Sequence, residues 1–176
     1  EEDFAKLKSK SRAVIVDYVD SNIDAMFATG IDIHLSTSFV GEAGLRAWID
    51  KIGAEGEART LLHNVDERLV RQPAKRNADT LDMLYVGSPR STVLPNSVLD
   101  DVTVLDGGTP DQFAQAQTAL ETTNAHYCVR PDSGENMNRK FKPFTKGFTA
   151  AWCGAPMLVN RSVDDAETLL GSDYPF

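Results

Sequence analysis

The chain has 176 residues, 41% hydrophobic and 25% charged, as expected of one soluble α/β domain. Its net charge of −8 argues against a nucleic-acid-binding protein, because binding to the phosphate backbone requires an excess of clustered Lys and Arg. No run of about 18 apolar residues and no signal peptide are visible, so we expect a cytoplasmic protein without a membrane span.

Two cysteines, Cys128 and Cys153, lie in apolar stretches, and we expect both to be packed free thiols. With three scattered His they give no metal-ligand spacing, so we expect no metal site. The chain begins in a mixed-charge stretch without a Met and stops on the apolar turn Tyr174-Pro175-Phe176. We therefore expect a fragment of a longer protein.

The first half alternates apolar runs with helical patterns. Strands are predicted at 13–18, 31–35 and 59–63, and a short helix at 23–29. The best helix signal is the spacing of four apolar residues that share one face before Gly53; these are Leu45, Trp48, Ile49 and Ile52.

The polar segment 65–80 contains four basic residues, Arg68, Arg71, Lys75 and Arg76. It has no helical or strand periodicity, so it is predicted to be a linker-like joint. A solvated surface loop is the alternative.

The second half is more regular. Strands are predicted at 81–86, 102–105, 126–129 and 156–159, and helices at 111–122, 144–153 and 163–170. Pro143 precedes the second of these helices and Gly154 follows it, which is the usual asymmetry of helix ends. Strands separated by helices predict a Rossmann-like three-layer α/β/α sandwich with a mostly parallel sheet.

Ligands of open parallel sheets bind at the carboxyl ends of the strands. Gly87 and Ser88 follow one predicted strand, where a glycine allows the backbone to approach a phosphate closely, and Arg90 adds a charge nearby. Arg130 follows another strand. The alternative is a simple turn with surface arginines.

The segment 142–149 is a stronger candidate. Its amides begin a helix whose dipole favours anions, and Lys142 and Lys146 add two positive charges. Thr145 is expected to cap this helix or to bind a phosphate oxygen. A capped surface helix with solvated lysines is the alternative.

Histidines and aspartates give weaker signals. His63 follows a strand and is a candidate base, although a structural or exposed His is the commoner case. His34 and His126 lie inside strand patterns and are expected to be structural. Asp17 and Asp20 are expected to form a turn rather than a metal site.

The order of these segments resembles the GT-B class of glycosyltransferases over about residues 13–176. The runs that carry the resemblance are TLLHNVDERL at 60–69, LDMLYVGSP at 81–89, VTVLDGG at 102–108 and KPFTKGFTAAWCGAPMLVN at 142–160. The last run is especially similar to bacterial surface-polysaccharide glycosyltransferases with a KPxTKxFTAAxCG pattern.

This resemblance implies a domain that binds a UDP- or GDP-sugar without metal or cofactor and transfers the sugar to an unknown acceptor. Residues 1–64 would be the tail of an acceptor domain, 65–80 a linker-like loop and 81–176 the nucleotide-sugar-binding domain, unless all form one compact domain. A face left bare by a missing domain would favour a homo-oligomer. His63 is the candidate catalytic residue. The candidate donor-binding residues are Asn64, Gly87, Ser88, Arg90, Arg130, Lys142, Thr145, Lys146 and Thr149.

The sequence departs from the family pattern at three positions. Retaining members often have two glutamates eight residues apart, where this chain has Phe141 and Thr149. Ser88 also stands where a diphosphate-binding Arg is common, so Arg90, Lys142 or Lys146 would replace it. Two alternatives therefore stay open: a non-catalytic nucleotide- or protein-binding module, and another Rossmann-like enzyme. The absence of GxGxxG after the first strand argues against a dinucleotide enzyme.

Overall fold

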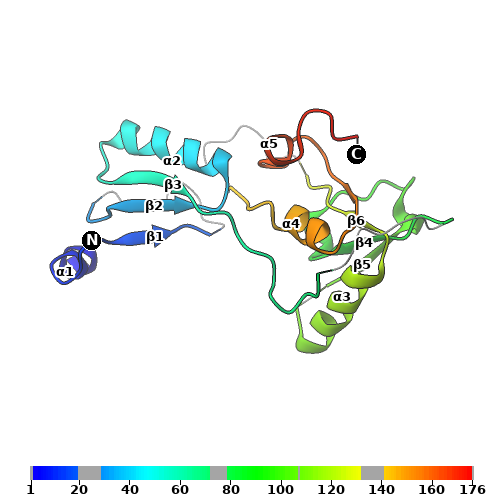
Figure 1. Cartoon of the computed structure of the whole chain (residues 1–176). Helices are drawn as coiled ribbons and strands as arrows, with labels where there is room; N and C mark the ends of the chain where they lie inside the picture. The colour runs from blue at the N-terminus through cyan, green and yellow to red at the C-terminus, as the bar shows by residue number, and fades with distance from the viewer. Residues whose placement is uncertain (1, 20–28, 72–78, 107, 132–140, 176) are drawn as a thin grey trace. The chain divides into compact units, whose positions relative to one another are not determined.

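The computed structural model is shown in Figure 1. It describes residues 2–19, 29–71, 79–106, 108–131 and 141–175. The chain forms two compact units. Unit 1 comprises Glu1–His63 and Ser133–Phe144, and unit 2 comprises Asn64–Asp132 and Thr145–Phe176. The boundary between His63 and Asn64 lies beside the junction expected at residue 64, whereas the return of 133–144 to unit 1 had no signal in the sequence.

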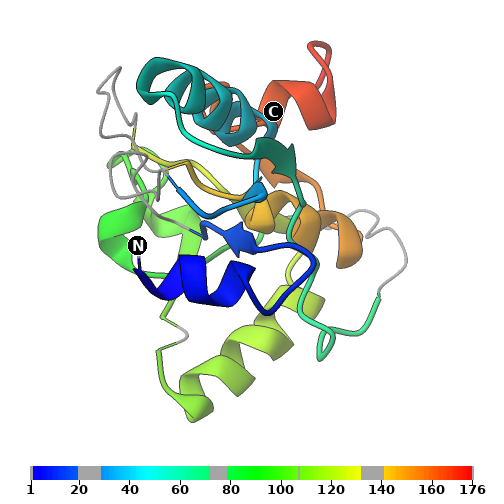
Figure 2. The same cartoon turned by 90° about the vertical axis from the view of Figure 1, so that its left-hand side faces the viewer.

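Unit 1 contains a parallel sheet with strand order β1-β2-β3. Its strands are β1 (Ile15–Asp17), β2 (Ile33–Ser36) and β3 (Glu57–Thr60), and its helices are α1 (Glu2–Lys8) and α2 (Phe39–Ile52). Helix α2 packs along β2 and β3 in both views (Figures 1 and 2). The predicted helix at 23–29 lies almost wholly outside the described residues.

Helix α2 begins and ends at residues with clear physical roles. The Ser38 side chain caps it by accepting a hydrogen bond from the Gly41 amide at 2.9 Å. Gly53 ends it in the left-handed conformation with φ 64°, and its N–H donates to the Ile49 carbonyl. The predicted apolar face is confirmed for Leu45, Trp48 and Ile49, whereas Ile52 is exposed. The helix starts earlier than its apolar repeat because Ser38 supplies the cap.

The core of unit 1 lies between α2 and the sheet. Tyr18, Leu45 and Ala58 are buried there. His34 is fully buried, with its Nδ1 3.0 Å from the Tyr18 hydroxyl and its Nε2 2.8 Å from the Glu55 carbonyl. Because both ring nitrogens have partners inside the core, the structural role expected for His34 is confirmed.

Helix α1 was missed by the sequence analysis. Its residues have mixed charge and no long apolar repeat, so nothing in their spacing indicates a helix. Lys8 at its end lies 3.3 Å from Asp32 and 3.6 Å from Glu55. The tertiary ion pairs thus support a helix that is too short to be stable alone.

Unit 2 contains a second parallel sheet, with strand order β5-β4-β6-β7. Its strands are β4 (Met83–Val86), β5 (Val102–Leu105), β6 (Ala125–Tyr127) and β7 (Met157–Leu158). Its helices are α3 (Pro110–Thr122), α4 (Thr145–Trp152) and α5 (Ala166–Leu170), and the short 3-10 turns η2 (Pro89–Ser91) and η3 (Leu99–Asp101) join β4 to β5.

Successive side chains of β4 and β6 point to opposite faces of this sheet. Met83, Tyr85 and Tyr127 form a buried cluster on one face with residues of the β4–β5 connection. On the strand β6, His126 alternates with Tyr127, and its Nε2 lies 3.1 Å from the Leu120 carbonyl at the end of α3. Buried at 3% exposure and bonded, His126 is also structural.

The fold class expected from the sequence is confirmed. Every strand pairing described is parallel, and helices pack against strands in a Rossmann-like α/β arrangement. The described strands form two sheets rather than one. Cys128 and Cys153 are buried free thiols, as expected.

Within the described parts of the chain, none of the helices has the length and apolar character needed to cross a membrane.

Candidate functional site

The strand order of unit 2 creates a switch point between β4 and β6. From β4 the chain moves to β5 on one side, and from β5 it crosses through α3 to β6 on the other side of β4. Connections therefore leave β4 and β6 in opposite directions, which opens a crevice at the carboxyl ends of these strands. Gly87 and Ser88 follow β4 at this edge, and Cys128 and Arg130 follow β6.

Lys146, the second residue of α4, reaches this edge. Its Nζ donates a hydrogen bond to the Val86 carbonyl and lies 4.3 Å from the centre of the Tyr85 ring. Gly87 has φ 138°, and a Cβ built there would be 3.2 Å from both Lys146 Nζ and the Tyr85 hydroxyl. The positive φ favours glycine at position 87, and the missing side chain leaves room for the Lys146 ammonium group.

Two positive charges act on the same buried thiol at the switch point. Burial raises the pKa of Cys128 to about 11, and the charges of Lys146 and Arg130 act in the opposite direction. Burial also raises the pKa of Tyr85, again opposed by Arg130. Cys128 is therefore protonated at neutral pH and is unsuited to act as a nucleophile. Lys146 and Arg130 place two positive charges near it, and the carboxylate of Asp106, directly after β5, adds a negative charge that acts on Tyr85.

A pocket of about 150 Å³ lies beside this lysine. It is lined by Leu84, Val86, Leu120, His126, Tyr127, Cys128, Thr145, Lys146 and Thr149. These residues include hydroxyls and an ammonium group but no carboxylate. Ligand pockets usually measure at least about 300 Å³, so this one would hold a single group of a larger ligand.

Asn160 connects the ends of β6 and β7. Its Oδ1 accepts a hydrogen bond from the Arg130 amide at 2.9 Å, and its Nδ2 donates to the Arg130 carbonyl at 3.1 Å. The side chain thereby fixes the backbone of Arg130. Asn160 is not among the predicted site residues, although its place directly after a predicted strand was a usable signal.

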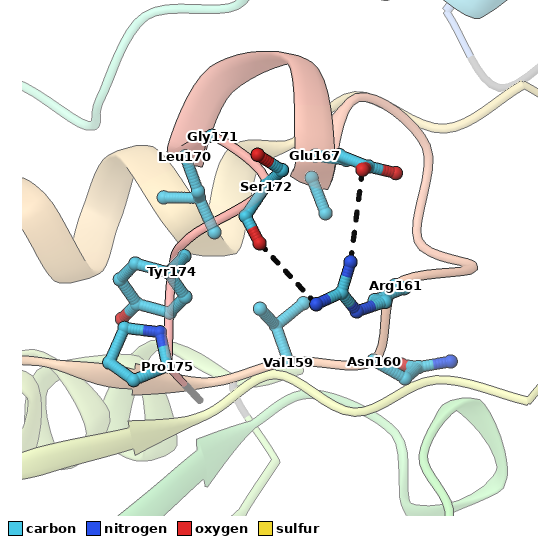
Figure 3. A pocket seen from close by; sticks show the side chains of 10 residues that line it. Val159, Asn160, Arg161, Glu167, Leu170, Gly171, Ser172, Tyr174 and Pro175 are labelled. Atoms are coloured by element: carbon cyan, nitrogen blue, oxygen red, sulfur yellow. Dashed lines mark hydrogen bonds and ion pairs between the residues drawn. The ribbon is translucent and has the colours of Figure 1, made fainter.

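A second pocket, of about 290 Å³, lies between the end of β7 and α5 (Figure 3). The Arg161 guanidinium lies 3.7 Å from Glu167 and 3.4 Å from the Ser172 carbonyl. At the outer edge of β7, the Tyr174 hydroxyl binds both the amide and the carbonyl of Met157 at 3.0 Å. This hydroxyl replaces a neighbouring strand and closes part of the sheet edge.

Five predicted donor-binding residues belong to the switch point of unit 2: Gly87, Arg130, Thr145, Lys146 and Thr149. The amide of Gly87 donates to the Leu105 carbonyl at 2.8 Å, so a ligand contact at this residue would depend on close approach rather than on its N–H. Thr145 is the first residue of α4 and not the residue before it. The expected role of Thr145, capping this helix or binding a phosphate oxygen, stays a prediction.

Ser88 and Arg90 are exposed in and beside η2. This turn has only three residues and no side-chain cap, so Gly87 and Ser88 do not lead into an α-helix. The geometry thus differs from that of a dinucleotide-binding glycine loop, which does lead into one.

The remaining predicted residues lie at the unit boundaries. His63 is half-buried and Lys142 is exposed, both in unit 1, while Asn64 begins unit 2 and accepts a hydrogen bond from the Val65 amide at 2.8 Å. Phe141, at a position where retaining glycosyltransferases often have a glutamate, lies against the first turn of α2, with its Cβ 3.0 Å from a Cβ built on Gly41. Catalytic and donor-binding roles for His63, Asn64 and Lys142 stay predictions.

No cluster of three or more His, Cys, Asp or Glu side chains suited to a metal occurs in the described residues. Asp17 is exposed at the end of β1, and Asp20 lies outside the described residues.

Protein-family models, curated proteins and solved structures give no match to this chain. Its function must therefore be inferred from the geometry of the switch point and from the sequence resemblance.

Proposed function

We propose that unit 2 binds a nucleoside-diphosphate sugar at the switch point between β4 and β6, as the donor-binding part of a glycosyltransferase-like protein. The observation that carries the proposal is the presence of two cations, Lys146 and Arg130, at the one edge of a parallel sheet where ligands of such folds bind. The order of sequence motifs supports the same assignment.

The charge of the site fits a diphosphate. A diphosphate carries about two negative charges, and a guanidinium and an ammonium bind such oxygens by charge-assisted hydrogen bonds. The pocket beside Lys146 offers the hydroxyls of Thr145 and Thr149 and contains no carboxylate that would repel the ligand.

In the proposed reaction, the bond between the sugar carbon and the diphosphate breaks while an acceptor hydroxyl forms the new glycosidic bond. Lys146 and Arg130 would stabilise the negative charge that develops on the leaving diphosphate, without a metal. The acceptor hydroxyl loses its proton to a base, and the role of His63 as that base stays a prediction from its place after a strand. The acceptor, the cytoplasmic location and a homo-oligomeric state stay predictions.

The alternative is a non-catalytic module that has kept the fold. One observation favours it: Lys146 is already bonded to the Val86 carbonyl and stacked on Tyr85, so part of its role is structural. Release of nucleoside diphosphate from a UDP- or GDP-sugar in the presence of acceptor would distinguish an enzyme from a binding module.

Calorimetry with UDP, GDP and their sugar conjugates tests the binding site. Replacing Lys146 by Met keeps the apolar stem but removes the charge. Since a hydrogen bond to a charged group contributes about 1.5–3 kcal/mol, we expect the affinity to fall at least about tenfold.

Lys51→Ala is the matched control, because Lys51 is an exposed lysine in the last turn of α2 in unit 1. It should leave the affinity unchanged. Equal affinities of the wild type and Lys146→Met would refute the site, and the absence of binding to any of these nucleotides would refute the proposed function.

A further inference from the structure

The segment 66–71, here called the strap, is irregular but well attached to unit 2. The sequence analysis expected a linker-like joint over 65–80, of which 72–78 lies outside the described residues. In the described part, Leu69 is only 5% exposed, although Arg68 and Val70 on either side of it are exposed. A buried apolar side chain in a polar segment indicates a docked element rather than a solvated one.

The strap is closed locally by Asp66. Its carboxylate accepts hydrogen bonds from the Arg68 amide at 3.0 Å and from the Arg68 guanidinium at 2.9 and 2.6 Å. These bonds lower the pKa of Asp66 to about 2. The Leu69 amide also donates to the Asp66 carbonyl at 3.0 Å, so the backbone turns back on itself and presents its next carbonyls outward.

On one side the strap binds α3. The Arg68 guanidinium lies 3.9 Å from the centre of the Phe113 ring. Gln117 donates a hydrogen bond to the Arg68 carbonyl, and Glu121 accepts one from the Val70 amide at 3.0 Å. Phe113, Gln117 and Glu121 are spaced by four residues, so the strap follows one face of the helix.

On the other side the strap binds the end of α4. The Trp152 indole N–H donates to the Leu69 carbonyl at 2.9 Å, and the Arg71 guanidinium lies 5.7 Å from the Trp152 ring centre. Thus a single stretch of six residues connects the last residue of α4 to three residues of α3.

We propose that the strap positions α4, and with it Lys146, at the switch point, which makes Trp152 a positioning residue for ligand binding. The importance of Lys146 in this inference rests on the proposed function. Helix α4 has only eight residues, too few to be stable without tertiary contacts. Its first turn carries Thr145 and Lys146, and the strap holds its other end, so the strap restricts the same rigid element that presents the cation.

The substitution Trp152→Phe tests this inference because it keeps an aromatic ring but removes the N–H that binds Leu69. We expect the dissociation constant for UDP or GDP to rise about three- to tenfold at a temperature at which the variant is fully folded. Hydrogen exchange at the amides of 147–152 should become faster. Trp48→Phe is the matched control, because Trp48 lies on α2 in unit 1. This variant should change neither the dissociation constant for UDP or GDP nor the hydrogen exchange of α4.

If the strap is coupled to the site, nucleotide binding must in turn stabilise the strap. Binding of UDP or GDP to the wild type should slow exchange of the Val70 amide. Unchanged affinity and unchanged exchange of α4 in Trp152→Phe would overturn the inference, as would a loss of thermal stability with both affinity and α4 exchange preserved.

A wrong assignment of the nucleotide site and a wrong role of the strap give different results in these experiments. If the wild type binds none of the nucleotides, the assignment of the site is refuted. Hydrogen exchange of α4 then remains as the test of whether the strap positions this helix. Faster exchange of α4 in Trp152→Phe would then support the positioning of α4, and unchanged exchange would refute it.

Discussion

The two units are built from the same kinds of element but connect their strands differently. In unit 1 the described strands follow one another across the sheet in the order β1-β2-β3, and α2 covers one face. In unit 2 the order β5-β4-β6-β7 places the first strand of the unit inside the sheet. Only the second order reverses the direction of the connections, so only unit 2 has a switch point among its described strands.

The helix starts of the two units differ in charge as well. At the start of α2, the Ser38 hydroxyl binds the Gly41 amide, and Glu42 accepts a hydrogen bond from the Thr60 hydroxyl at 2.5 Å. The Thr60 hydroxyl is the main cause of a lowered pKa for Glu42. The start of α4 instead carries Lys146. The first turn of α2 is thus closed by its own side chains, whereas the first turn of α4 carries a cation.

The largest expected effect tests whether the two units are thermodynamically separate. Leu45→Ala in unit 1 and Met83→Ala in unit 2 each remove a buried side chain, at a cost of about 2–5 kcal/mol. We expect each variant to lower the unfolding transition of its own unit. Trp48 reports on unit 1 and Trp152 on unit 2, so fluorescence of single-tryptophan variants can follow the two transitions. One shared transition that shifts equally in both variants would contradict this separation.

A smaller effect is expected from two glycines that occupy crowded positions. A Cβ at Gly41 would lie 2.1 Å from Ser36 Oγ and 2.7 Å from the capping Ser38 Oγ, so Gly41→Ala should destabilise unit 1 by about 1–3 kcal/mol. Gly87→Ala should destabilise unit 2 to a similar extent, because φ 138° is strained for alanine, and should also weaken nucleotide binding by displacing Lys146. Denaturant unfolding and calorimetry measure the two effects.

Gly53→Ala is a useful reference, because its φ is 64° but no atom lies within 4 Å of the added Cβ. The change in unfolding free energy of Gly53→Ala therefore reports the backbone strain alone, without steric crowding. If Gly41→Ala stabilised unit 1, as an alanine in an uncrowded helix would, the close packing around Gly41 would be refuted.

The smallest effect concerns pH and the strap. The folded pKa of Asp66, about 2, lies below its ordinary value of 3.8, so its interaction with Arg68 stabilises the fold above about pH 4. This stabilisation should disappear as the pH falls from about 4 to 2. Because both side chains are partly exposed, we expect a small change that weakens further in salt.

Asp66→Asn provides the control in an acid titration followed by Trp152 fluorescence. Its signal should lack the part of the acid transition that the wild type shows between pH 4 and 2. Identical acid transitions of both proteins would show that Asp66 does not stabilise the strap.

Most strands in the described part of the chain were predictable because they are short runs of β-branched or apolar residues. The exception is β3 (Glu57–Thr60), which is largely polar and begins two residues before the predicted strand. The strand predicted at 102–105 has the same bounds as β5, whereas the one predicted at 59–63 extends beyond β3, since Leu61 continues the apolar pattern but lies outside the ladder. The helices with apolar faces and glycine ends were also predictable. Helix α1 was not, because its support comes from Asp32 and Glu55, which are distant in sequence.

The candidate site was predictable only in part. Lys146 was chosen for its place at a helix start, and Gly87 for its place after a strand. Their closeness depends on the hydrogen bond from Lys146 to Val86, 60 positions away in the sequence, which local patterns do not encode. Asn160 was passed over because its role depends on the backbone of Arg130 in a neighbouring strand end. The strap was predicted to be part of a linker because its sequence is mostly polar, and nothing local indicates that Leu69 is buried.

The sequence by itself indicated most of the strands and helices but not α1, since periodicity, β-branched runs, caps and glycine stops are local properties of the chain. It also determined that the thiols are buried and that the strands are parallel, because helices separate most of them. Only the tertiary structure decided how the strands divide into two sheets, where the chain reverses between β4 and β6, and which polar groups already have partners. These features depend on contacts between distant residues, whose free energies arise only when the elements pack together.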